Sequence, residues 1–368
     1  MSTVFQPAPR IAQFLPEPAP PAPPAGAAER PRVLNLNESP FGPSPAVVDA
    51  MQYALQHANR YPDHQGHALC ALIAARSAIA ADRVVVGAGS NELLFISADV
   101  CVDAGDEVIA PVPGFPSFAR STLMRSGTLV GVHCNSAGCV DVDAVLAAIT
   151  SRTRLVFVSS PHNPTGGVLT RAEIERLVHG VPEQALLHFD EAYYEFGQHA
   201  GACETLPILE RRRGAWISTR SFSKAYGLAG ARIGYGLAST PELASAYRAA
   251  RINFSASSVG MAGAMAAWND SAALTALLSH NAARRDQLVA GLASLGYRAL
   301  PGAANFSAFV TPVPAPALQA GLRDHGILVL AFPLPGTDGA LRISMGTEQD
   351  MQAVIDAAHE LAGAPGPA

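Results

Sequence analysis

Short apolar segments that alternate with helical ones constrain the fold of this chain more than any other feature. Between residues 84 and 238, runs of β-branched and aliphatic residues recur, and helix-like segments separate most of them. Runs that are apolar throughout indicate strands buried on both faces. The pattern predicts an α/β fold, a three-layer sandwich in which helices cover both faces of a mostly parallel sheet. The expected strands are 84–86, 107–110, 128–133, 154–159, 185–189, 215–219 and 233–238.

The chain divides into three expected parts. Residues 1–32, rich in Pro and Ala from 16 to 31, are expected to form a partly disordered N-terminal arm. Residues 33–255 are expected to form a large unit, in which 33–45 pass by a smaller one. Residues 256–368 are expected to form that smaller α/β unit, linked through one or two long helices between 259 and 295. Its expected strands are 306–311, 327–332 and 341–346, and its expected helices are 315–325 and 348–362.

Composition excludes several classes of function. The net charge of 25 − 30 = −5 gives no basic surface for nucleic acid or an anionic membrane. No apolar run reaches the ~20 residues needed to cross a bilayer, and the first residues lack the pattern of a secretory signal. The five cysteines are scattered and never form a C-x-x-C pair, so we expect reduced thiols in a cytoplasm. Cys134 and Cys139 lack the His/Cys neighbours of a metal site, and no metal is expected.

A lysine motif between residues 217 and 235 carries the clearest chemical signal. Lys224 follows Ser221 and Ser223, whose hydroxyls can bind a phosphate, and precedes Arg232, which can grip one in a bidentate way. A lysine held near another cation and away from bulk water can lose its proton and attack a carbonyl. An isolated lysine in a Ser/Gly loop is more often simply solvated. The whole motif nevertheless indicates a Schiff-base lysine with a phosphate anchored beside it.

A second stretch, 84–98, predicts an anion site. A strand, the tight loop 87–91 and a helix follow one another, so that free backbone N–H groups near Ser90 and Asn91 and the helix dipole point at one spot. The third glycine of the dinucleotide fingerprint is absent, and so is the P-loop lysine. A nicotinamide dehydrogenase is therefore a poor alternative.

Four further residues fall near the ends of expected strands, where ligands of parallel sheets bind. Asp190 can pair with a protonated ring nitrogen and make a pyridine an electron sink. Tyr193 and Asn163 can bind a phenolate oxygen, and Phe115 can stack on a ring. Each of them taken alone is more often structural: a cap or ion-pair partner, a core aromatic or a turn.

The order and approximate spacing of these motifs resemble those of the fold-type I, class I/II aminotransferases. The resemblance runs from about Asn35 to Gly346, and it is nearest to the histidinol-phosphate aminotransferase group. The motifs that carry it are NLNESPFGPSP, RYPDHQG, PHNPTGGVL, SFSKAYGLAGARIGY and LRISMGT. The resemblance implies an aspartate-aminotransferase-like fold, a large pyridoxal 5'-phosphate domain plus a smaller α/β domain.

The resemblance also implies roles for individual residues. Lys224 would carry the cofactor as a Schiff base and move the Cα proton, with Asp190 and Tyr193 as its catalytic partners. The cofactor's ring would be held by Asp190, Tyr193, Asn163 and Phe115. Its phosphate would be bound by the backbone of Ser90 and Asn91, the side chains of Ser221 and Ser223, and Arg232.

Substrate and partner assignments rest on the same resemblance. Arg342 would bind the acidic group of the substrate, an amino donor or a 2-oxo acid acceptor, and Asn37 and Asn163 would line the substrate side. Tyr61 resembles the tyrosine that reaches the phosphate of a neighbouring subunit, which implies a homodimer with shared sites.

One position departs from the histidinol-phosphate group. Leu330 stands where the group's G-x-L-V-R strand carries an arginine. Losing one of two cations for a substrate phosphate removes a contact of about 1.5–3 kcal/mol. We therefore expect a different amino donor, such as an aromatic or otherwise specialised amino acid. Two alternatives remain open: other pyridoxal-phosphate chemistry on the same fold (decarboxylation, cyclisation, elimination or oxidation), and a binding module that keeps the fold without catalysis.

Overall fold

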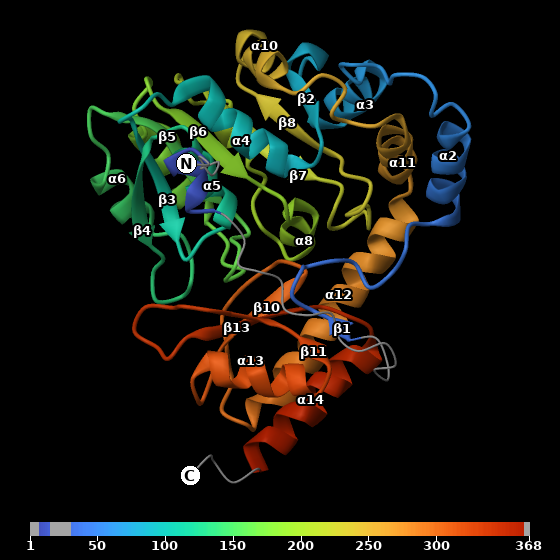
Figure 1. Cartoon of the computed structure of the whole chain (residues 1–368), viewed down its shortest axis with the longest axis vertical. Coiled ribbons are helices and arrows are strands. Elements are labelled where there is room, and N and C mark those ends of the chain that lie inside the picture. The colour runs from blue at the N-terminus through green and yellow to red at the C-terminus, as the bar shows by residue number, and fades with distance from the viewer. Residues whose placement is uncertain (1–6, 15–30, 364–368) are drawn as a thin grey trace, which may run out of the picture.

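The computed structural model describes residues 7–14 and 31–363, and a seven-stranded sheet lies at the centre of its larger part, the upper one in Figure 1. The strand order is β2-β8-β7-β6-β5-β3-β4. Strand β8 runs antiparallel to both of its neighbours, β2 and β7, and the other strand pairs of this sheet are parallel. The prediction of a mostly parallel sheet is therefore confirmed. The strands are β2 (Val84–Gly87), β3 (Glu107–Val112), β4 (Thr128–His133), β5 (Thr153–Ser159), β6 (Leu186–Asp190), β7 (Trp216–Ser221) and β8 (Gly234–Ala238).

Helices cover both faces of this sheet, which confirms the three layers. The strands alternate between two cores: Val85, Phe157 and Ile217 face one side, whereas Val86 and Trp216 face the other. On the first side lie α4 (Ser90–Cys101), α5 (Pro116–Met124) and α10 (Pro241–Ala250). On the other lie α2 (Pro45–Leu55), α3 (His67–Ser77), α6 (Val142–Ala147), α7 (Arg171–Gly180), α9 (Leu206–Leu209) and α11 (Ser258–Asn269).

Several boundaries differ from the sequence-based expectation. Helix α4 begins at Ser90, two residues before the expected start, because Gly89 has a φ of 81° and turns the chain there. Strand β6 includes Asp190 as its last residue, so the carboxylate belongs to the sheet's edge. Several short elements were not expected, among them η1 (Ala81–Arg83), α8 (Tyr194–His199) and α9.

A second, antiparallel sheet has its own core. Its order is β12-β13-β10-β9, formed by β9 (Arg298–Ala299), β10 (Phe306–Val310), β12 (Leu330–Phe332) and β13 (Ala340–Ser344). Helices α13 (Ala315–Asp324) and α14 (Glu348–Gly363) pack on it, and Phe309, Leu322 and Val354 meet in one buried cluster. This is the smaller α/β part that the sequence predicts.

One expected strand, 327–332, is divided between two sheets. Its first part, β11 (Ile327–Leu328), pairs in parallel with β1 (Arg32–Val33), and its second part, β12, joins β13. The segment after β1 is thereby held against the smaller part.

Helices α11 and α12 (Ser271–Ala293) connect the two cores. Trp268 of α11 lies in the larger core, whereas Leu288 of α12 lies in the smaller one. We propose on this basis a large domain over 33–255 and a small domain over 256–368, with these helices as the link. Of the expected arm, residues 7–14, which include α1 (Pro9–Ala12), and residues 31–32 are described; the rest of 1–32 lies outside the described residues. None of the described helices is long and apolar enough to cross a membrane.

Candidate active site

A cavity of about 380 Å³ opens at the edge of the large sheet where β6 and β7 end. Parallel strands present their carboxyl ends and the following helix N-termini at such an edge, which makes it the usual ligand site. Almost every site residue predicted from the sequence lines this cavity. They are Asn37, Ser90, Asn91, Phe115, Asn163, Asp190, Tyr193, Ser221, Ser223, Lys224, Arg232 and Arg342.

Lys224 projects its amine into this cavity. It is the only lysine in the sequence. Its Nζ donates hydrogen bonds to the backbone carbonyls of Leu36 at 3.1 Å and Asn37 at 2.9 Å. Burial, and then the positive charge of Arg342, lower the pKa of this amine to about 8, against the opposing charge of Glu38. A lysine with such a pKa is partly neutral, and therefore nucleophilic, near neutral pH.

Asp190 lies at the end of β6 and is 6% exposed. Its Oδ1 accepts hydrogen bonds from the Ala192 N–H at 3.1 Å and the Thr219 hydroxyl at 3.3 Å. Among the residues that the structure describes, no hydrogen bond reaches Oδ2, which leaves that oxygen for a ligand. Burial raises the pKa of Asp190 to about 7, so a cationic partner in the cavity would stabilise its ionised form.

Four side chains from distant segments form a connected polar group opposite. The Tyr193 hydroxyl accepts from Asn37 Nδ2 at 2.9 Å and from Asn163 Nδ2 at 3.4 Å. Arg342 Nη1 donates to Asn163 Oδ1 at 2.6 Å. Arg342 is 7% exposed, and its Nε has no partner within the described part of the chain. Arg342 lines the cavity, so its guanidinium can meet an acidic ligand there.

The N-terminus of α4 forms the other end of the cavity. Gly89 turns the chain so that Ser90 and Asn91 begin the helix with backbone N–H groups that no helical carbonyl satisfies. Gly234 of β8 lies so close that a Cβ there would overlap the Ser90 nitrogen. The helix N-terminus is thus held against the sheet edge and favours an anion.

Three more side chains converge on the same end. Arg232 Nη1 donates to Ser223 Oγ at 3.2 Å, and its Nη2 donates to the Ala88 carbonyl at 3.3 Å. Ser221 Oγ accepts from the Ser223 N–H at 3.1 Å. A guanidinium, two hydroxyls and a helix N-terminus together form a site suited to a phosphate.

Phe115 and Tyr61 differ in placement. Phe115 precedes α5, lines the cavity and packs edge-on against Phe118. Tyr61 is 82% exposed, stacks on Phe254 with ring centroids 4.6 Å apart, and does not line this chain's own cavity. A role for Tyr61 in a neighbouring subunit's site stays a prediction.

Some lining residues were not predicted, namely Asn35, Leu36, Glu38, Ala192 and Ala229. The first three come from the NLNES segment, of which the sequence singled out Asn37 alone. Asn37 has a φ of 55°, which turns this segment so that consecutive carbonyls face Lys224. An Asn between two strand-like residues is a signal for such a left-handed turn.

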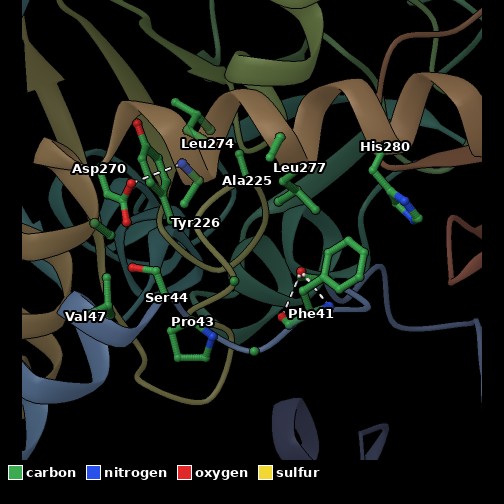
Figure 2. A pocket seen from close by; sticks show the side chains of 16 residues that line it. Phe41, Pro43, Ser44, Val47, Ala225, Tyr226, Asp270, Leu274, Leu277 and His280 are labelled. Carbon is green, nitrogen blue, oxygen red and sulfur yellow. Dashed lines mark hydrogen bonds between the residues drawn. The ribbon is translucent and has the colours of Figure 1, made fainter.

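A second cavity of about 350 Å³, largely apolar, lies on the other side of the lysine loop. Figure 2 shows Tyr226, Leu274 and Leu277 around it, and Phe41 beside His280 at one end. The Phe41 and His280 rings meet edge-on at 4.7 Å. No group of three or more His, Cys, Asp or Glu side chains able to hold a metal occurs among the described residues.

Comparison with known proteins defines the class to which this fold and site belong. Residues 32–357 match the pattern of the family described as aminotransferase class I and II, and the chain belongs to that family of pyridoxal-phosphate-dependent enzymes. Within the family it is similar to histidinol-phosphate aminotransferases, as the motifs predict.

Three relatives illustrate this similarity. The histidinol-phosphate aminotransferase of Ruegeria pomeroyi is 38% identical over 328 residues, 88% of this chain and 89% of the relative. The aromatic amino acid aminotransferase of Rhodococcus jostii is 37% identical over 323 residues, 88% of both chains. The crystal structure of histidinol-phosphate aminotransferase from Sinorhizobium meliloti, in complex with pyridoxal-5'-phosphate, matches with a TM-score of 0.89 and 31% identity over 98% of both chains. The predicted aspartate-aminotransferase-like fold is thereby confirmed.

Proposed function

We propose that this chain binds pyridoxal 5'-phosphate in the cavity at Lys224 and transfers an amino group between an amino acid and a 2-oxo acid. The observation that carries the proposal is the position of the lone lysine, inside one cavity with a buried carboxylate and an anion-binding helix N-terminus. When bound, the cofactor supplies an aldehyde for amine exchange and a ring that withdraws electrons from the substrate's Cα.

The residues present fit this cofactor at each of its polar groups. The free Oδ2 of Asp190 suits a protonated ring nitrogen, and the Tyr193 hydroxyl with Asn163 suits a ring oxygen. Phe115 offers an aromatic surface beside them. The phosphate would be held by the α4 N-terminus at Ser90 and Asn91, with Ser221, Ser223 and Arg232.

Lys224 would act both as the nucleophilic amine and as the proton carrier at Cα. Its amine donates hydrogen bonds to the carbonyls of Leu36 and Asn37, and these bonds hold it in a defined position from which it can accept a proton. Its lowered pKa of about 8 keeps part of it neutral at physiological pH, as a general base requires.

The substrate's acidic group would bind Arg342, whose guanidinium lines the cavity. Leu330 lies directly opposite Arg342 in the ladder of β12 and β13, so their side chains share one face. The pair would give a substrate one cation, Arg342, for its carboxylate and an apolar side chain, Leu330, beside it. Leu330 supplies no second cation for a substrate phosphate. We therefore propose an amino acid with an apolar or aromatic side chain as donor, in preference to histidinol phosphate.

A homodimer would place Tyr61 at the partner's phosphate site. Support comes from a group of exposed apolar residues near it: Tyr61 is 82% exposed, Ile252 76% and Phe254 39%. The Tyr61 and Phe254 rings stack on each other, and exposed aromatic pairs of this kind are typical of a protein interface. We propose a cytoplasmic location, in line with five cysteines that are all unpaired.

The test is a half-reaction without an acceptor. Protein loaded with pyridoxal phosphate is mixed with single amino acids or histidinol phosphate, and the cofactor is released by acid and identified. Conversion to pyridoxamine phosphate that 2-oxoglutarate reverses is the expected result. Release of carbon dioxide, ammonia or peroxide with the cofactor unchanged would instead favour a decarboxylase, lyase or oxidase, and conversion chiefly by histidinol phosphate would contradict the proposed donor.

A further inference from the structure

A series of hydrogen bonds begins at Asp190 and continues from the cavity into the buried interior of the protein. Thr219 Oγ1 lies 3.3 Å from Asp190 Oδ1, and His188 Nε2 lies 2.9 Å from Thr219 Oγ1. On the other side of the imidazole, Ser97 Oγ is 2.5 Å from His188 Nδ1, and Tyr247 OH is 2.5 Å from Ser97 Oγ. Four side chains thus connect the cavity's carboxylate to helix α10.

The fold explains why these residues meet. His188 and Asp190 are two positions apart on β6, so they point to the same face of the sheet. Thr219 is the partner of Asp190 in the ladder between β6 and β7. Helices α4 and α10, which carry Ser97 and Tyr247, cover that face.

All four side chains of this hydrogen-bonded series are isolated from solvent. Thr219, His188, Ser97 and Tyr247 are each 0% exposed. Burial lowers the pKa of His188 to about 3, so the imidazole is neutral and carries a single N–H. A neutral imidazole donates through one nitrogen and accepts through the other.

These limits favour one direction for the hydrogen bonds when Asp190 is ionised. A carboxylate can only accept, so the Thr219 hydroxyl donates to it. Thr219 Oγ1 then accepts from His188 Nε2–H, which leaves His188 Nδ1 as an acceptor. The Ser97 hydroxyl has two acceptors within reach, His188 Nδ1 at 2.5 Å and the Leu93 carbonyl at 3.0 Å, and the shorter contact favours donation to His188. Ser97 Oγ in turn accepts from Tyr247. All donors point toward Asp190, and aligned dipoles of this kind stabilise a negative charge at the end of the chain.

We propose that His188 is a positioning residue that, together with Thr219, Ser97 and Tyr247, orients Asp190 as an ionised acceptor for the cofactor's ring nitrogen. This inference deepens the proposed function and rests on it for the identity of the ligand. The arrangement itself is a property of the cofactor-free chain and can be measured there.

The first test reads the tautomer of His188 in cofactor-free protein. Protein labelled with ¹⁵N-histidine is studied by NMR, and the His188 signals are assigned from His188→Phe. The expected result is a neutral imidazole with its proton on Nε2 from pH 6 to 9. Tyr247→Phe should shift the Nδ1 signal, whereas Tyr297→Phe, at a buried tyrosine of the smaller core, should not. A proton on Nδ1, or equal effects of the two tyrosine variants, would overturn the proposal.

The second test measures pyridoxal-phosphate binding by fluorescence titration. His188→Phe should weaken binding about tenfold, the effect of roughly one hydrogen bond. His188→Gln, which keeps a donor directed at Thr219, should bind within about threefold of the native protein. Native protein that binds no cofactor would contradict the proposed function and leave the tautomer result standing. Equal binding by native protein and His188→Phe would contradict the positioning role alone.

Discussion

The pKa of Lys224 can be measured directly, because the chain has no other lysine. Protein grown with lysine labelled with ¹³C at Cε gives one side-chain signal, whose shift follows protonation of the amine. In cofactor-free protein we expect a pKa of about 8 in place of 10.5. The difference corresponds to about 3 kcal/mol between the protonated and neutral forms.

The shift has a functional consequence. At pH 7.5 a lysine with a pKa of 8 is about one quarter neutral, against about 0.1% for an ordinary lysine. The reactive fraction of Lys224 is therefore raised by roughly two orders of magnitude before any cofactor binds.

Two substitutions test the causes of this pKa shift, and they should change the pKa of Lys224 in opposite directions. Arg342→Gln removes a neighbouring positive charge, so the protonated amine becomes easier to form and the pKa should rise. Glu38→Gln removes a negative charge, so the pKa should fall further. Arg323→Gln, on the distant helix α13, is the control and should leave the value unchanged. A native pKa near 10.5, or shifts of the same sign in both variants, would refute the reasoning.

Three further predictions concern the donor, the core and the interface. Leu330→Arg should raise turnover of histidinol phosphate and leave that of α-amino acids intact; steady-state rates that do not change would speak against it. Arg220→Met should lower the unfolding free energy by about 3–5 kcal/mol in denaturant titrations. The substitution leaves the buried carboxylate of Glu191, which lies 3.0 Å from the Arg220 guanidinium in the native protein, without its cationic partner. A loss under about 1 kcal/mol would contradict this. Tyr61→Ala should weaken pyridoxal-phosphate binding in the dimer, while Tyr53→Ala, another exposed tyrosine, should not.

Local sequence patterns were sufficient for the sheet and for most of the cavity's lining. Strand β4 runs from 128 to 133 as predicted, since its β-branched and aliphatic residues mark a strand even though only Val132 is buried. Asp190, Lys224 and the α4 N-terminus could be found because each lies at or just after the end of a strand, and parallel strands end at one edge. Their convergence therefore needed no knowledge of long-range contacts.

The tertiary structure alone decided what surrounds those groups. The carbonyls that hold Lys224 come from residues 188 and 187 positions earlier, and Asn37 reaches Tyr193 across 156 positions. Residues 327–332 form one apolar run, yet they join two sheets that differ in their partners. In the sequence, His188 is simply one residue of a buried strand. Its hydrogen bonds to Ser97 and Thr219, and through Thr219 its connection to Asp190, depend on how α4 and α10 pack on the sheet. Periodicity reports that a side chain is buried, whereas its partner depends on how distant segments pack, and that is why the polar contacts of the site could not be read from the sequence.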